Sequence, residues 1–253
     1  MNYSPRFQII IVLCLMITSI HTSLADYHNA EEIIRRVDEN MVVQSAFYRA
    51  KLVISMGGEM REKKFIGYTR GKENAYIEFT FPARDKGTRF LKLGSEMWMY
   101  LPSLERATKI AGHMLRQSLM GSDFSYDDIA ENERLLDLYS VELSGVDTFA
   151  GKICYILKLQ AKVKEVTYYE RKIWVDTINY IPWHVEFYAK TGKLLKELTT
   201  FEFKKISGHN YPTKIKMVNK LRKETYTEMV IEDIEIDTKI EERIFTKSYL
   251  ERK

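Results

Sequence analysis

Residues 97–103 have the sequence Met-Trp-Met-Tyr-Leu-Pro-Ser, and this stretch decides the fold that we predict. The two methionines and Leu101 alternate with Trp98 and Tyr100, which predicts a strand with apolar or aromatic side chains on both faces. The proline that follows ends the strand, because proline cannot donate a hydrogen bond to a neighbouring strand. The stretch therefore carries more apolar surface than a two-sided strand needs.

A second apolar segment follows at residues 112–120, where we predict a short helix, and a polar turn over Gly121–Asp128 closes the unit. The apolar residues of this helix are Met114, Leu115, Leu119 and Met120. Methionine-rich surfaces adapt to ligands whose shape is not fixed. We interpret the strand as one wall, and the helix as the lid, of a lipid pocket.

Length and composition indicate a folded chain with a sizeable core. The sequence has 253 residues, 45% of them hydrophobic, with 16 tyrosines and 12 phenylalanines. That is enough for one large domain or two small ones. Neither an internal repeat nor a clean domain boundary is visible, so we expect a single lipid-binding domain over residues 26–253.

The first 25 residues predict a signal peptide. Arg6 gives a positive start, residues 7–20 are almost all apolar, and Ser23 and Ala25 supply small residues for cleavage before Asp26. An uncleaved N-terminal anchor is the alternative. Cleavage predicts a secreted, periplasmic protein and leaves Cys154 without a second cysteine to pair with.

The charge of the chain does not indicate nucleic-acid binding. Removal of residues 1–25 takes away Arg6 and no acid, so 39 basic side chains become 38 against 35 acidic ones, a net charge of +3. These charges are spread along the chain, whereas nucleic-acid-binding domains gather theirs in a patch.

Most of the remaining chain predicts antiparallel strands. In residues 48–56 apolar side chains alternate with Arg49, Lys51 and Ser55, which is typical of a strand with one face in water. We count about ten or eleven such strands in succession. So many strands must curl, so we predict a mainly β fold: a curved, half-open antiparallel β-barrel whose concave apolar side is covered by helices.

Helices are expected at few places. Residues 30–41 place Ile33, Ile34 and Val37 on one face, and Asn29 is a plausible N-terminal cap. Residues 133–139 fit either a helix or a strand.

No catalytic or metal-binding motif is recognisable in the sequence. The histidines lack partners at ligand spacing, and His184 is interpreted as a surface residue of its strand. No nucleophile motif or phosphate-binding loop is present, and Cys154 is interpreted as a small core residue. We expect no enzyme activity, no metal and no cofactor. A hydrolase with an unrecognised site is the least favoured hypothesis.

The acidic turn at residues 123–128 resembles the start of a calcium loop, with oxygens at its first, third and fifth positions. Its sixth position is Asp128 instead of glycine and its twelfth is Arg134 instead of glutamate. We therefore favour a capping box, formed by Ser125 and Asp128, before a short helix at Ile129.

These segments together resemble a known family. The resemblance rests on residues 88–91, 97–103, Arg106 and 118–128. It is to the outer membrane lipoprotein-sorting protein family, which is related to the periplasmic lipoprotein carrier LolA, and it spans residues 30–245. It implies a half-open barrel with an apolar cavity for acyl chains, and a periplasmic location.

The predicted function is that of a carrier. It would shield the acyl chains of a lipoprotein or another lipid during transfer towards the outer membrane, between inner-membrane donor and outer-membrane acceptor proteins, and act as a monomer. The cavity residues that we expect are Leu52, Ile54, Ile77, Phe79, Leu91, Met97, Met99 and Leu101, with the four apolar residues of 112–120 as lid. The alternative is a non-enzymatic interaction or sensor domain of the same fold that binds a membrane-protein partner instead of lipid.

Overall fold

The computed structural model describes residues 29–252, with the exception of residues 131–133, residue 165 and the side chain of Ala130. The predicted signal peptide therefore lies outside the described residues. Within the described part, no helix is both long and apolar enough to span a membrane.

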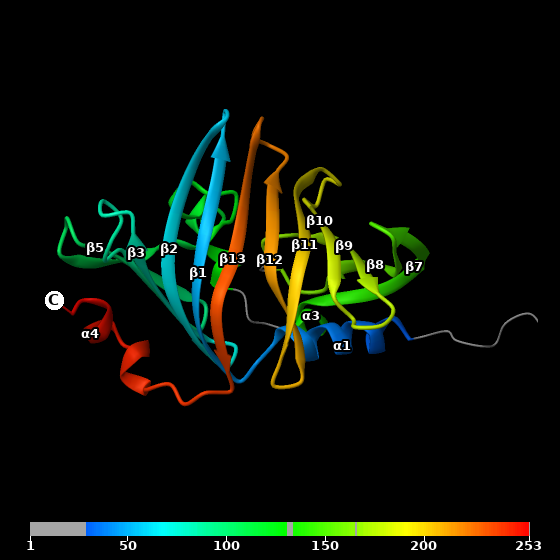
Figure 1. Ribbon diagram of the computed structural model, residues 1–253, viewed down its shortest axis with the longest axis horizontal. Coiled ribbons are helices and arrows are strands. Elements are labelled where there is room, and N and C mark those ends of the chain that lie inside the picture. Colours follow the sequence, from blue (N-terminus) through cyan, green and yellow to red (C-terminus); the bar gives the residue numbers. More distant parts are fainter. Residues whose placement is uncertain (1–28, 131–133, 165, 253) are drawn as a thin grey trace, which may run out of the picture.

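The described residues form one antiparallel sheet of thirteen strands (Figure 1). In chain order the strands are β1 (Ser45–Met56), β2 (Glu59–Arg70), β3 (Asn74–Phe81), β4 (Arg89–Leu93), β5 (Glu96–Leu101), β6 (Arg106–Ile110), β7 (Tyr139–Phe149), β8 (Lys152–Ala161), β9 (Glu170–Asp176), β10 (Pro182–Tyr188), β11 (Leu194–Ile206), β12 (His209–Asn219) and β13 (Thr225–Ile236). The sheet is curved and open, so the predicted mainly β, half-open architecture is confirmed.

The strand order explains how the chain is laid out. Across the sheet the order is β6-β5-β4-β3-β2-β1-β13-β12-β11-β10-β9-β8-β7. The chain starts in the middle, runs outward to one edge at β6, and returns from the opposite edge at β7 until β13 pairs with β1. The segment between β6 and β7, residues 111–138, must therefore cross the width of the sheet, and we call it the connector. In Figure 1 part of it passes behind the central strands.

The number of strands corrects the prediction of ten or eleven. The strand β7 was not predicted, because a bulge between Leu143 and Gly145 interrupts its alternation and most of its side chains are exposed. An edge strand with few buried side chains gives little periodic signal.

The first helix is confirmed with its predicted bounds. Helix α1 (Ala30–Met41) begins after Asn29, whose side-chain oxygen accepts a hydrogen bond from the backbone N–H of Glu31 at 3.0 Å. It buries Ile33, Ile34 and Val37 and packs against β12, β7 and α3. The remaining helical elements are the α-helices α2 (Tyr126–Ala130), α3 (Leu135–Leu138) and α4 (Lys247–Leu250), and the 3₁₀ turns η1 (Gly112–Met114), η2 (Leu119–Gly121) and η3 (Glu242–Phe245).

The helix predicted over residues 112–120 is wrong. The segment instead forms two separate 3₁₀ turns, η1 and η2, joined by irregular backbone. Ser118 is extended, and Met120 has a φ of 51°, so neither residue continues a right-handed helix. For residues 133–139 both a helix and a strand were open, and residues 135–138 form the helix α3.

The two apolar faces of β5 are covered by different parts of the molecule. Met97 and Met99 face the main core on the concave side of the sheet. Trp98 and Tyr100 face the opposite side and pack under the C-terminal tail, with Phe245 among its buried residues. The C-terminal tail thus covers one of the two apolar faces predicted for residues 97–103, and only the other face points towards the concave side.

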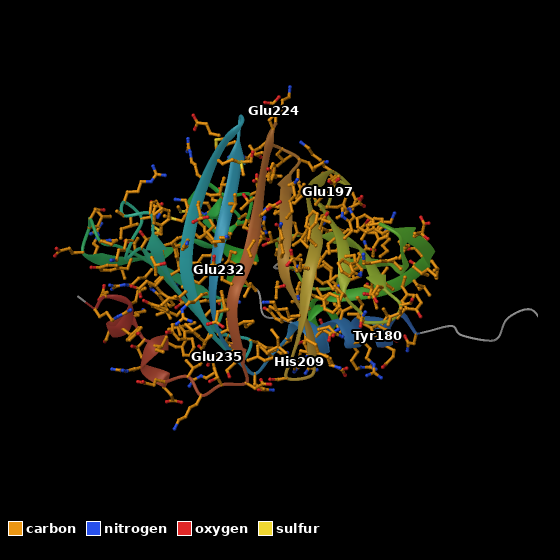
Figure 2. The ribbon with its side chains drawn as sticks, viewed as in Figure 1. Tyr180, Glu197, His209, Glu224, Glu232 and Glu235 are labelled. Carbon is orange, nitrogen blue, oxygen red and sulfur yellow. The ribbon has the colours of Figure 1, made fainter. Side chains whose placement is uncertain are left out.

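Two hairpin ends project from the sheet. The β1–β2 turn and the β12–β13 loop lie next to each other, since the N–H of Gly57 donates to the carbonyl of Glu224 at 3.3 Å. Figure 2 shows Glu224 at the extremity of the molecule, away from Tyr180 and His209.

Candidate functional site

An apolar cavity of about 250 Å³ lies on the concave side of the sheet, between α1, the connector and the central strands. We call it the concave cavity. The apolar residues that line it are Val37, Met41, Val42 and Val43 from α1 and the residues after it; Ala46 and Tyr48 from β1; Phe124, Ile129 and Leu135 from the connector; and Ile173, Pro182, Val185, Phe187, Leu198, Tyr211, Ile215, Met217, Met229 and Ile231 from β9 to β13.

The cavity owes its lining to the period of the strands. Val185 and Phe187 on β10 point to the concave side, while Glu186 between them points away. The same alternation places Ile215 and Met217 of β12 on the concave side. This alternation makes most of the residues that line the cavity apolar.

Three charged side chains stand at the wall of the cavity: Asp38, Asp128 and Arg171. Asp38 is buried on α1 and accepts hydrogen bonds from the backbone N–H groups of Leu135 and Leu136 at 3.0 and 3.5 Å, so it caps α3. Burial raises the pKa of this carboxyl, and the two backbone donors oppose that effect. The capping carboxylate thus fixes the end of the connector to α1.

Arg171 on β9 is surrounded by aromatic rings. Its guanidinium carbon lies 4.8 Å from the ring centre of Tyr139, 5.3 Å from that of Phe187 and 5.7 Å from that of Tyr168. Its Nε donates to the hydroxyl of Tyr139 at 3.1 Å. This buried cation is therefore held by ring faces and hydrogen bonds at the edge of an apolar space.

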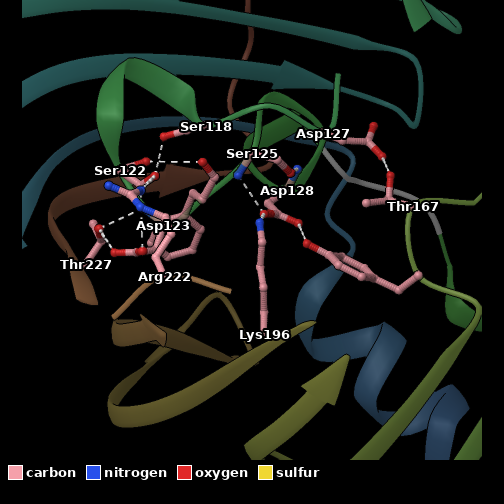
Figure 3. Close-up of polar contacts among 12 residues, drawn as sticks. Ser118, Ser122, Asp123, Ser125, Asp127, Asp128, Thr167, Lys196, Arg222 and Thr227 are labelled. Atoms are coloured by element: carbon pink, nitrogen blue, oxygen red, sulfur yellow. Dashed lines mark hydrogen bonds and ion pairs between the residues drawn. The ribbon is translucent and has the colours of Figure 1, made fainter. Parts of the chain in front are cut away.

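The connector is fastened to β13 by a buried carboxylate (Figure 3). Asp123 accepts hydrogen bonds from the hydroxyls of Thr225 and Thr227, each at 2.8 Å, and its own N–H donates to the Thr227 hydroxyl at 2.9 Å. Arg222 adds a hydrogen bond to the carbonyl of Ser122 at 3.2 Å and lies 3.6 Å from the Asp123 carboxylate. We call these contacts the Asp123 clamp.

A second carboxylate fastens the connector to the other half of the sheet. Asp128 accepts hydrogen bonds from Nζ of Lys196 on β11 and from the hydroxyl of Tyr168, each at 2.7 Å. The side chains of Lys196 and Asp128 are only 10% and 7% exposed. We call this group the Asp128 clamp (Figure 3). Phe124 directly follows Asp123, and Ile129 directly follows Asp128. The two clamps therefore hold both side chains over the concave cavity.

The predicted capping box is confirmed. The N–H of Ser125 donates to the carboxylate of Asp128 at 2.7 Å, and the N–H of Asp128 donates to the hydroxyl of Ser125 at 3.2 Å. The helix that this box caps, α2, begins at Tyr126 and not at Ile129 as predicted, and the Asp128 carboxylate binds Lys196 as well.

The predicted cavity residues mostly lie in the packed part of the main core. Leu52, Ile54, Ile77, Phe79 and Met97 are buried there, and Met99 is half-buried against them. Leu91 lies on the opposite face of the sheet, in the cluster under the C-terminal tail, and Leu101 is half-buried. Among the described residues that line the concave cavity, none belongs to this predicted set.

The four predicted lid residues are spread along the connector. Leu119 is buried, Leu115 and Met120 are half-buried against the main core, and Met114 is 38% exposed. The connector does cover the concave side, but its residues at the concave cavity are Phe124, Ile129 and Leu135. The capping box was the sequence signal near these residues, because Ile129 directly follows its second member, Asp128.

A separate, polar groove of about 710 Å³ brings two of the predicted residues together. Met97 and Leu115 both belong to its lining. The rest of its lining is Lys72, Glu73, Lys92, Gly94, Ser95, Gly112, Arg116, Asp127, Asp137, Lys164, Val166 and Thr167. Half of its lining residues are charged, which suits water more than an acyl chain.

The other residues considered for chemistry have structural environments. Cys154 is buried, and burial raises the pKa of its thiol. His184 is not a surface residue as predicted: its ring stacks on Phe149 at 4.9 Å and meets the edge of Trp174 at 4.9 Å. Within the residues that the structure describes, no three His, Cys, Asp or Glu side chains are grouped as a metal site would require.

Solved structures share this fold. A DUF1329 family protein from Desulfovibrio piger has a TM-score of 0.81 at 26% identity, over 87% of this chain and 97% of that one. A domain described as an outer membrane lipoprotein-sorting protein, from Vibrio parahaemolyticus, has a TM-score of 0.77 at 24% identity, over 88% and 100%. A LolA superfamily protein from Nitrosomonas europaea has a TM-score of 0.75 at 26% identity, over 87% and 98%.

These similarities confirm the resemblance to lipoprotein-sorting proteins that the sequence indicated. No curated protein matches the sequence. A family model described as that of an uncharacterized protein matches residues 71–252, more than half of the chain, so the chain belongs to that family, and its fold is that of the LolA superfamily.

Proposed function

We propose that this chain is a periplasmic carrier that shields the acyl chains of a lipoprotein or another lipid in the concave cavity during transfer towards the outer membrane. The observation that carries the proposal is an apolar cavity covered by a segment without a long helix or strand, which two polar clamps and its own apolar side chains hold in place. The names of the relatives from Vibrio parahaemolyticus and Nitrosomonas europaea agree with it. The signal-peptide pattern of residues 1–25 supports the periplasmic location.

The physical need for such a cavity is large. An acyl chain in water costs about 0.8 kcal/mol per methylene, so a sixteen-carbon chain costs about 12 kcal/mol. A lipid that crosses an aqueous compartment therefore needs apolar surface on every side. A carrier supplies that surface without the membrane.

The size of the cavity implies that the connector moves. Cavities that enclose a small ligand usually measure about 300–1,000 Å³, and the concave cavity measures about 250 Å³. It accepts part of an acyl chain while the connector stays closed. A longer chain has to displace Phe124 and Ile129, so lipid and connector compete for the same apolar surface, which lowers the net affinity and allows release.

The proposal also covers the oligomeric state of the chain and its partner proteins. The chain acts on its own, as one domain over residues 26–253, and exchanges lipid with inner-membrane donor and outer-membrane acceptor proteins. It performs no chemistry on its cargo. The main support is that the lining is mostly apolar and that its three charged side chains, Asp38, Asp128 and Arg171, each hold a neighbouring element of the chain.

The test is binding of a fluorescent hexadecanoyl probe to matched variants. Leu198→Phe fills part of the concave cavity, whereas Ile153→Phe adds the same ring at a residue that is 61% exposed. We expect Leu198→Phe to weaken probe binding about tenfold, from loss of one or two buried methylene contacts, and Ile153→Phe to leave it unchanged. Cooperative unfolding shows that each variant is folded.

A second pair of variants tests the residues predicted from the sequence. Met99→Asp and Leu115→Asp are expected to abolish probe binding in a folded protein if the lipid also uses the core near the polar groove. Unchanged binding by both would limit the site to the concave cavity. Absence of probe binding to the wild-type protein would contradict the carrier and favour an interaction domain.

A further inference from the structure

Hydroxyl groups from three strands lie on the wall of the concave cavity. They belong to Tyr48 on β1, Thr69 on β2 and Tyr211 on β12. The charged side chains of the same wall are all engaged in hydrogen bonds with neighbouring elements. In contrast, none of the three hydroxyls forms a hydrogen bond with any group of the described chain. They are therefore the polar groups of the wall that are left to meet a bound molecule.

The two tyrosine hydroxyls lie deep in the protein and still have open space beside them. Burial raises the pKa of both, and the nearby Tyr211 raises the pKa of Tyr48 further. Within the part of the chain that the structure describes, the fully enclosed hydroxyl that lacks a partner is that of Thr213, so those of Tyr48 and Tyr211 are not enclosed by protein atoms. Both hydroxyls keep their protons at neutral pH and can donate a hydrogen bond into the cavity.

The position of Tyr48 depends on a glycine. Tyr48 and Gly67 are directly opposite each other on β1 and β2, and a Cβ on Gly67 would lie 2.4 Å from the Tyr48 hydroxyl oxygen. The missing side chain lets the Tyr48 ring lie across β2, where it meets the ring of Phe65 edge-on at 6.1 Å. Buried tyrosine hydroxyls usually find a hydrogen-bond partner. A hydroxyl that is fixed by packing and has no partner in its own chain indicates a partner in the ligand.

The surroundings favour a neutral acceptor as that partner. The one cation among the described lining residues, Arg171, is held by aromatic rings and by the hydroxyl of Tyr139. Asp38 and Asp128 bring two carboxylates to the same wall. An anionic group would approach these carboxylates, whereas the oxygens of an ester accept hydrogen bonds without carrying a charge. Glycerolipids attach each acyl chain through such an ester.

We propose that the concave cavity recognises an acyl ester, with the hydroxyls of Tyr48 and Tyr211 donating to the ester oxygens while the chain lies against the apolar lining. The inference rests on the proposed carrier function and names the chemical class of its cargo. It makes the cavity selective for the ester end of a lipid chain over a bare hydrocarbon, because a hydrocarbon would leave both buried hydroxyls without partners.

Displacement of the fluorescent hexadecanoyl probe by competitors of equal chain length tests this inference. Methyl dodecanoate, dodecyl methyl ether and dodecanoate present an ester, an ether and a carboxylate. We expect the ester to bind the wild-type protein at least about tenfold more tightly than the weakly accepting ether, since each neutral hydrogen bond contributes about fivefold. The ester should also bind more tightly than the carboxylate. Tyr48→Phe and Tyr211→Phe should each weaken ester binding about fivefold, and the double variant should bind ester and ether alike.

Tyr226→Phe is the matched control. Thr225 and Thr227 on either side of Tyr226 bind Asp123 of the connector, so the Tyr226 ring lies on the opposite face of the sheet. There it packs under Nζ of Lys216 at 3.9 Å. This variant should bind all three competitors like the wild-type protein, and cooperative unfolding shows that each variant is folded.

Infrared spectroscopy of the bound ester with an isotope-labelled carbonyl adds a direct readout. Hydrogen bonds weaken the C=O bond, so its stretching frequency should be lower in the wild-type protein than in the double variant. The inference is overturned, and the carrier function retained, if the wild-type protein binds the probe but binds ester and ether equally or prefers the carboxylate. If neither the probe nor any competitor binds, the carrier function itself fails and the inference fails with it.

Discussion

The Asp128 clamp allows a sharp prediction about how the connector is held. Lys196 and Asp128 form an ion pair at 2.7 Å whose side chains are 10% and 7% exposed. Removal of one partner from a buried pair costs about 3–5 kcal/mol, because the other charge stays buried without compensation. We therefore test Lys196→Met, Asp128→Asn and the double variant.

The hydrogen bonds that remain in each single variant determine where its loss of stability falls between about 3 and 5 kcal/mol. After Lys196→Met, the Asp128 carboxylate keeps the hydrogen bonds from Tyr168 and Ser125, so we expect a loss of about 3 kcal/mol in the free energy of unfolding. Asp128→Asn leaves the buried ammonium of Lys196 without its carboxylate, and we expect about 4 kcal/mol. The double variant buries no uncompensated charge, so the coupling energy should be about 2–3 kcal/mol.

Equilibrium urea denaturation followed by tryptophan fluorescence measures these values. A loss of 3 kcal/mol corresponds to a midpoint shift of about 1 M for a slope of about 3 kcal/mol per M. Lys158→Met is the control, because Lys158 pairs with Glu170 at an exposed site and should change the free energy by less than about 1 kcal/mol. Single-variant losses that add within about 0.5 kcal/mol would refute the coupling of the connector to β11 through this pair.

Three further predictions address other parts of the molecule. A Cβ on Gly67 would lie 2.1 Å from Cζ of Tyr48, whose ring lines the concave cavity, so Gly67→Ala should cost about 2 kcal/mol and weaken acyl-probe binding, and an unchanged urea midpoint would contradict this. Burial lowers the pKa of His184, so the unfolded chain binds the proton more readily and the free energy of unfolding should fall as pH decreases below about 6.5. Urea titrations at pH 7.5 and 5.5 measure this change in the free energy of unfolding, and His184→Asn should reduce it. An equal change in the variant and the wild-type protein would rule the effect out. Phe245→Ala removes a buried ring of the C-terminal tail and should cost about 3–5 kcal/mol by the same measurement, whereas a loss under about 1 kcal/mol would show that the tail does not stabilise the sheet.

The fold could be predicted because its signals are local. Alternation over residues 48–56 and the helical period over 30–41 are set by side chains close in sequence, and the structure confirms both elements. The strand β7 escaped prediction for the same reason, since the bulge at Gly145 and its exposed edge position remove the local pattern. Helix prediction failed at residues 112–120. The apolar side chains there pack against the core from an irregular backbone and do not form one face of a helix.

The candidate site was harder to predict because it depends on what lies opposite each strand. Alternation shows that both Leu52 and Leu198 face inward, but it does not show that Leu52 meets packed neighbours while Leu198 meets a cavity. That difference arises from the path of the connector, which follows from β6 and β7 being at opposite edges. The two clamps likewise join Asp123 to Thr227 and Asp128 to Lys196 across many residues of chain, and no local pattern in the sequence links these partners.

Native mass spectrometry of the protein purified from a periplasm without detergent, followed by lipid extraction, decides whether the concave cavity carries lipid. We predict a discrete added mass that resolves into a phospholipid, a lipoprotein acyl chain or another lipid, and that is reduced in Leu198→Phe but retained in Ile153→Phe. A mass equal to that of the protein alone, unchanged after incubation with lipids and a lipoprotein, would contradict the carrier function.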